Sequence, residues 1–99
     1  MTDFAMTPDS RVIRRRDLPS AELGPMIHAV MNDRRDHYFA LRDTSAAIWD
    51  LLAEELTIAD LCARLCERFN VSAETCRKDT LEFLEELRRE GLVEVREQL

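Results

Sequence analysis

The apolar positions in the first part of the chain fall in short runs that are typical of strands. Residues 11–16 contain an adjacent pair of β-branched residues and are followed by a break at Pro19. Residues 26–31 and 37–42 are apolar and β-prone, and the polar residues between them have the composition of a turn. The pattern therefore predicts a hairpin over residues 26–42, with residues 11–16 as a third antiparallel strand.

After Asp43 the apolar spacing changes to that of helices. A first helix is predicted over residues 45–55, with either Thr44 or Asp43 as its cap, because apolar residues recur there with a period near 3.6. Thr57 precedes Asp60 by three positions, and this capping pattern predicts a second helix that ends near Phe69.

A third and longer helix is predicted from its two ends. Ser72 is a favourable N-cap, and Gly91 after Glu90 is a favourable left-handed C-terminal cap. Residues 92–95 then form a short strand. The predicted fold class is α+β, with a three-stranded antiparallel sheet packed on a three-helix bundle that is like a winged helix-turn-helix.

Length and composition indicate one small domain. The 99 residues are 45% hydrophobic, and residues 1–10 have no sustained period, so we predict a flexible N-terminal segment and a single domain over residues 11–99. No run approaches the ~20 apolar residues that span a bilayer, and the first residues lack the pattern of a signal peptide. These observations predict a cytoplasmic protein without a membrane partner.

The charge is distributed unevenly along the chain. The protein has 14 basic and 20 acidic residues, a net charge of −6, and residues 44–99 carry all of the excess. Because binding to nucleic acid is driven by basic residues that neutralise phosphates, an acidic helical half argues against nucleic acid as a partner.

The residue types that carry chemistry are sparse. Cys62, Cys66 and Cys76 fall on apolar stripes, so we expect reduced, buried thiols rather than a metal site or a nucleophile. No serine lies in a nucleophile-elbow pattern, and two glycines are too few for a phosphate-binding loop. The sequence therefore predicts a protein that is not an enzyme and has no cofactor.

The predicted third helix has one apolar residue away from its core stripe. The stripe consists of Cys76, Thr80, Phe83, Leu84 and Leu87. Leu81 lies about 120° from its centre, between Arg77 and Arg88, and is either a lone exposed leucine or part of a groove. Asp79, Glu82 and Glu86 on the other flank are interpreted as solvated surface.

The last predicted strand, residues 37–42, contains no proline, lysine or glutamate. If it lies at the edge of the sheet, its unpaired backbone groups are poorly protected against the addition of another strand. An extended peptide could then pair with this strand while the third helix contacts its side chains.

The order of these elements resembles the PqqD-like family, whose members are also called recognition elements of ribosomally synthesised and post-translationally modified peptides. The resemblance starts in the strand from Tyr38 to Arg42 and continues through Ile48 and Trp49 into a leucine-rich helix. Further matching positions are Thr57 to Leu61, Phe69 to Val71, Asp79, Leu84, Leu87 and Gly91 to Val93. The turn at residues 34–36 lacks the glycine of many relatives, and Arg42 stands where an asparagine usually ends the strand.

The resemblance implies a non-catalytic chaperone for peptides. Such a domain binds the leader region of a precursor peptide by strand addition and presents it to a modifying enzyme, such as a leader peptidase or a radical SAM enzyme. The peptide-binding residues that it implies are Tyr38, Phe39, Ala40, Leu41, Arg42, Arg77, Lys78, Leu81, Leu84, Glu85 and Arg88. The members that act in pyrroloquinoline quinone synthesis carry a Leu-Leu-Ala-Pro-Glu type segment that is missing here, so we expect another pathway, such as one for lasso peptides or a radical-enzyme product.

Two other functions fit the same outline. One is a winged-helix transcriptional regulator that binds DNA, although residues 74–90 hold four basic and six acidic residues, whereas base-reading helices are usually basic. The other is a structural subunit that docks on an enzyme through its acidic face.

Overall fold

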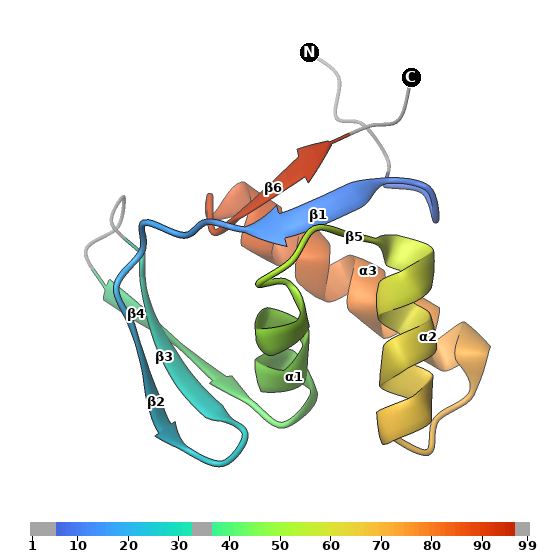
Figure 1. Cartoon of the computed structure of the whole chain (residues 1–99), viewed down its shortest axis with the longest axis horizontal. Helices are drawn as coiled ribbons and strands as arrows, with labels where there is room; N and C mark the ends of the chain where they lie inside the picture. The colour runs from blue at the N-terminus through green and yellow to red at the C-terminus, as the bar shows by residue number, and fades with distance from the viewer. Residues whose placement is uncertain (1–5, 33–36, 97–99) are drawn as a thin grey trace.

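The computed structural model describes residues 6–32 and 37–96, which form nine helices and strands (Figure 1). In chain order they are β1 (Arg11–Arg14), β2 (Ser20–Gly24), β3 (Ile27–Asn32), β4 (His37–Arg42), α1 (Thr44–Leu51), β5 (Leu56–Thr57), α2 (Ile58–Arg68), α3 (Ala73–Arg89) and β6 (Val93–Arg96). The mixed α+β class and the three helices are as predicted. Of the turn predicted over residues 32–36, Asn32 is the last residue of β3, and residues 33–36 lie outside the described residues.

The strands form two antiparallel sheets of three strands each, with the orders β5-β1-β6 and β2-β3-β4. The predicted hairpin of β3 and β4 is confirmed, but the prediction that residues 11–16 complete its sheet is wrong. Val12 in β1 instead lies opposite Leu56 and Val95, far away in the sequence. The third strand of the hairpin sheet is β2, whose residues are exposed or half-buried and so lack the apolar alternation that marks a strand.

The helix ends follow the predicted capping chemistry. The Thr57 side chain accepts a hydrogen bond from the Asp60 backbone N–H at 3.1 Å, and Ser72 accepts one from the Thr75 N–H at 3.2 Å. Gly91 has a φ of 76°, as a left-handed cap requires. Only α1 differs, because it ends at Leu51, four residues before the predicted boundary.

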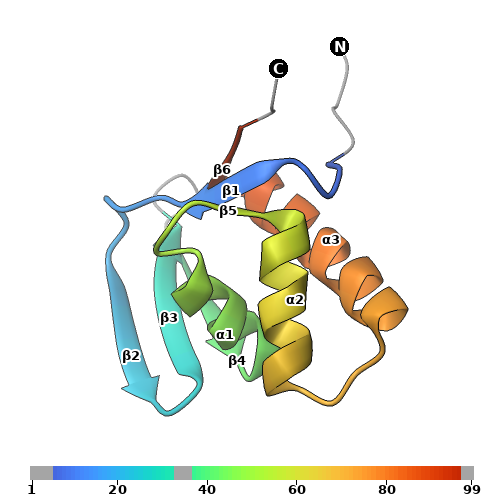
Figure 2. The same cartoon turned by 45° about the vertical axis from the view of Figure 1, so that its right-hand side comes forward.

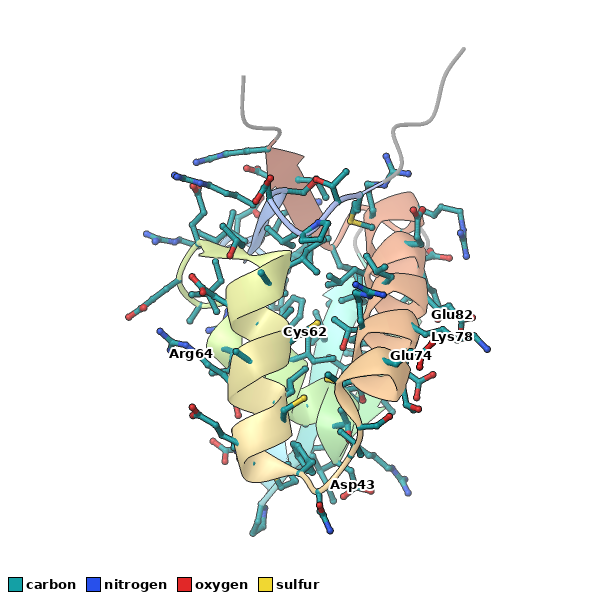
Figure 3. All side chains as sticks on the ribbon, turned by 90° about the vertical axis from the view of Figure 1, so that its right-hand side faces the viewer. Asp43, Cys62, Arg64, Glu74, Lys78 and Glu82 are labelled. Atoms are coloured by element: carbon teal, nitrogen blue, oxygen red, sulfur yellow. The ribbon has the colours of Figure 1, made fainter. Side chains whose placement is uncertain are left out.

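The core lies where the helices meet the inner face of the β2-β3-β4 sheet. Figure 2 shows α1 between this sheet and α2, and Figure 3 shows α2 and α3 side by side. Val30 and Leu41 point inward from β3 and β4 and are buried, as is Trp49 from α1. Phe83, predicted as a core aromatic, is half-buried at the edge of the core. This arrangement leaves the opposite face of the sheet, which includes Ala40, uncovered by these helices.

Residues 6–10 lie against the first turn of α2. The Ile58 N–H donates to the Ser10 carbonyl and the Ala59 N–H donates to the Pro8 carbonyl, each at 3.0 Å. The Met6 side chain is buried. Residues 6–10 are the described part of the segment that was predicted to be flexible. Their carbonyls therefore accept hydrogen bonds from backbone N–H groups at the start of α2, which have no partner within the helix. Among the described helices, none has the length and apolar character needed to cross a membrane.

Candidate functional site

Strand β4 is an edge strand: it pairs with β3 on one side, and no described strand pairs with its other side. The Asp43 N–H donates to the Met26 carbonyl at 2.9 Å. Because hydrogen-bonded pairs alternate along an antiparallel ladder, Phe39 and Leu41 direct their backbone groups toward β3. The backbone N–H and C=O groups of Tyr38 and Ala40 therefore point to the open edge.

The Ser45 hydroxyl closes one end of this edge. It accepts a hydrogen bond from the Arg42 N–H at 2.9 Å and donates to the Arg42 carbonyl at 2.8 Å. Both Arg42 backbone groups point away from β3, as the alternation requires, and α1 supplies their partner. The stretch of edge available to another strand thus ends at Ala40.

The two edges of the hairpin sheet differ in their protection. Strand β2 forms the other edge, and it lies between Pro19 and Pro25 and carries the charged Glu22. Proline and charge are the features by which edge strands avoid pairing with other chains. Strand β4 has no proline, its only Arg, Lys, Asp or Glu side chain is Arg42 at its last position, and its Tyr38 is 63% exposed. The less protected edge is therefore the one that continues into α1.

Helix α3 runs alongside β4 in the opposite direction. At one end, the Asn32 side chain at the end of β3 donates to the Glu90 carboxylate at 2.8 Å, next to the start of β4. At the other end, Ser45 lines a cavity together with Thr75 and other residues of the first turns of α3. The first turns of α3 therefore lie at the closed end of the β4 edge.

The cavity has a volume of about 250 Å³. The start of α1, the end of α2, the α2–α3 turn and the first half of α3 form its walls. The lining residues are Thr44, Ser45, Ile48, Leu65, Phe69, Val71, Thr75, Cys76, Asp79, Thr80 and Phe83. Its walls are mainly aliphatic and aromatic, with hydroxyl groups and one carboxylate among them.

The structure separates the residues that the resemblance implied. Tyr38 to Arg42 lie in the edge strand β4, but Arg77 lines a different groove, together with Ala59 and Cys62. Figure 3 shows Cys62 between α2 and α3 and Lys78 on the outer side of α3. At 100° per residue, Leu81 and Arg88 share the Arg77 flank, whereas Thr75, Asp79 and Phe83 lie on the cavity side.

The remaining implied residues are engaged within the domain. Leu84 is fully buried, and Leu81 is half-buried against the core. Glu85 and Arg88 form an ion pair at 3.1 Å. Contact of any of these α3 residues with a peptide stays a prediction.

Sequence reasoning missed the cavity residues Ser45, Thr75 and Asp79. The sequence contained a signal for this side of the helix. Asp79 and Glu86 lie on the same helix flank, and Phe83 lies where this flank borders the core stripe. That flank was interpreted as solvated surface because the position of the strand relative to the helix was unknown. The apolar residue Val71, 45% exposed at the cavity, was a second signal.

The comparison with protein families gives one match. The model of the family described as coenzyme PQQ synthesis protein D (PqqD) matches residues 28–93. The chain belongs to the PqqD family. No curated protein and no solved structure matches the chain. The matched region begins in β3 and ends in β6, so the PqqD domain includes β4, α3 and every residue that lines the cavity.

The thiols of this PqqD domain have the environment of packing residues. Cys62, Cys66 and Cys76 are free cysteines, and burial raises the pKa of the Cys62 thiol. The Cys76 thiol lies 3.8 Å from the Cys62 carbonyl. No group of histidine, cysteine and acidic residues in the described part of the chain could hold a metal ion. PqqD family proteins work with biosynthetic enzymes in peptide pathways.

Proposed function

We propose that this protein binds the leader region of a ribosomally synthesised precursor peptide and presents it to a modifying enzyme, without catalysing a reaction itself. Family membership supports an accessory role in the biosynthesis of modified peptides. The observation that carries the proposal is the edge of β4, which is the less protected edge of the hairpin sheet and presents the backbone groups of Tyr38 and Ala40.

Strand addition gives a small domain sufficient affinity. Up to four backbone hydrogen bonds can form with Tyr38 and Ala40, and each contributes ~0.5–1.5 kcal/mol net. Burial of one large apolar side chain adds ~1.5–3 kcal/mol. A flexible leader loses conformational freedom when it binds, so we expect affinity near the micromolar range rather than far below it. Such affinity suits a protein that must also release its peptide to an enzyme.

We infer that α2, the short turn, α3 and β6 follow the outline of a winged helix-turn-helix, and that this outline serves peptide rather than DNA. Acidic residues outnumber basic ones over residues 74–90. The exposed Asp79 and Glu86 would lie near phosphates if α3 entered a groove. Phosphate contacts supply most of the affinity of DNA-binding proteins, and this helix is poorly suited to make them.

A pair of proline substitutions tests strand addition. In Ala40→Pro the lost N–H points to the open edge, so the β3 ladder keeps its hydrogen bonds and proline is tolerated. In Glu22→Pro the same change falls on the opposite edge, because Ala21 and not Glu22 faces β3. We expect the first variant to bind a fluorescent leader peptide, taken from a precursor gene adjacent to this one, about tenfold more weakly, and the second to bind like the wild type.

Circular dichroism and thermal unfolding of both variants check that the fold is retained. Equal affinity of the two proline variants, with both folded, would show that the peptide does not add to β4. A leader peptide that does not bind the wild-type protein at any concentration up to the millimolar range would refute the function itself.

A further inference from the structure

We infer that the cavity beside Ser45 selects the peptide: it accepts one large apolar side chain, and it does so from a peptide segment that is basic or uncharged rather than acidic. This inference rests on the proposed function. It adds the class of peptide sequence and the position of the selective residue, which neither the family match nor the open edge specifies.

The size of the cavity fits a bulky side chain. An engineered apolar cavity of ~150 Å³ binds benzene, so the volume of about 250 Å³ beside Ser45 accommodates a side chain as large as phenylalanine. Ile48, Phe69 and Phe83 provide apolar walls. Val71 at the same cavity is 45% exposed and would be covered by such a side chain.

Ser45 connects the cavity with the open edge. Its hydroxyl is bound to both backbone groups of Arg42, and the residue also lines the cavity. A peptide paired with Tyr38 and Ala40 must therefore leave the ladder at Arg42, where the cavity begins. The selective residue of the peptide lies beyond the residue that faces Ala40, on the side toward Arg42.

The charges on the side of α3 that faces the cavity are negative. Asp79 lines the cavity, and Glu86 continues the same helix flank and is exposed. The basic residues of α3 lie elsewhere: Arg77 faces the groove beside Cys62, and Arg88 is paired with Glu85. A peptide along this flank comes within a Debye length of ~8–10 Å of the carboxylates, so an acidic segment is repelled and a basic one is attracted.

A selection from a displayed library of random 12-residue peptides tests both parts of the inference on the full chain. We expect the enriched peptides to share one large apolar residue and a net positive charge. Thr75→Phe places an aromatic ring in the cavity and should weaken their binding about tenfold or more. Arg64→Phe adds the same ring on the outer side of α2, away from the cavity (Figure 3), and should not change it.

Charge selection has its own variant. The double substitution Asp79→Lys and Glu86→Lys should shift the net charge of the enriched peptides from positive toward negative, and 500 mM NaCl should remove most of the difference. One result would overturn this inference and leave the proposed function standing. In that result the enriched peptides bind the wild type and lose affinity in Ala40→Pro, but they share no apolar residue or charge and Thr75→Phe does not affect them. Failure to enrich any peptide that distinguishes the wild type from Ala40→Pro would overturn both.

Discussion

Replacement of Ser45 by alanine is expected to change stability and peptide binding in different directions. In the wild-type protein the Ser45 hydroxyl makes two hydrogen bonds to Arg42, at 2.9 and 2.8 Å. These bonds hold the end of β4 against α1 and at the same time occupy the last two backbone groups of the open edge. Ser45→Ala removes the bonds and leaves those groups available to a bound peptide.

The size of each effect follows from the contacts. Each hydrogen bond contributes ~0.5–1.5 kcal/mol, but both lie at the surface where water can replace them, and alanine is the better helix former by a few tenths of a kcal/mol. We expect Ser45→Ala to lose ~1 kcal/mol of stability, which lowers the Tm of a domain of this size by ~4–8 °C. Peptide binding can gain up to two hydrogen bonds, while ordering one more residue costs ~1–2 kcal/mol. The net effect is an affinity between unchanged and about fivefold tighter.

Thermal unfolding, followed by the fluorescence of the buried Trp49, measures the first effect, and the anisotropy of a labelled peptide measures the second. Thr44→Ala is the matched control, because it removes a neighbouring hydroxyl that lines the same cavity, whereas the described hydrogen bonds of the Arg42 backbone go to Ser45. A Tm equal to that of the wild type would show that the Ser45 bonds contribute nothing. A tenfold loss of affinity in Ser45→Ala, but not in Thr44→Ala, would show that Ser45 supports peptide binding instead of limiting it.

Three further predictions concern the domain itself. Asp43 is exposed and has a φ of 55°, so Asp43→Gly should relieve backbone strain and raise the Tm by a few degrees, which a melting curve checks against the wild type. Ser72→Ala removes the N-cap bond of α3 and should cost ~1 kcal/mol in urea unfolding, whereas Ser20→Ala at the exposed β2 edge should cost much less. Burial raises the pKa of the Cys62 thiol, so its thiolate fraction at pH 8 is reduced, and iodoacetamide should label it more slowly in the native protein than in 8 M urea; equal rates would contradict the burial.

The helices were predictable because local chemistry determines their ends. Thr57 and Ser72 cap the helices that follow them, and Gly91 ends α3 with the positive φ that glycine adopts readily. These are interactions between residues three or four positions apart, so the sequence contains all the information. The early end of α1 is different, since the chain must reach β5 to pair with β1, and that partner lies more than 40 residues away.

The sheet arrangement was only partly predictable for the same reason. The hairpin of β3 and β4 is local and was found, but the sheet of β1 depends on pairing with β6 near the other end of the chain. Strand β2 has no buried residue and gives no hydrophobic signal; only pairing with β3 makes it a strand. The candidate site depends on these long-range contacts. The sequence left the edge position of its strand as a condition, which the described sheet order meets, whereas the helix flank beside it could be identified only once Asn32 and Glu90 fixed the path of α3.

Two described non-glycine residues have a positive φ: Met26, in the turn between β2 and β3, and Asp43, at the junction of β4 and α1. Asp43 adopts a positive φ that non-glycine residues avoid, and its side chain makes no cap bond to α1. The next turn nevertheless directs Ser45 back to Arg42, which brings the open edge and the cavity into contact. Strained backbone persists only where the surrounding structure enforces it, and natural proteins tolerate such violations mainly at functional sites. Because the strain, the hydroxyl clamp and the cavity coincide at one turn, we infer that this turn, rather than the flank of α3 that carries Leu81, determines where a bound peptide leaves the sheet.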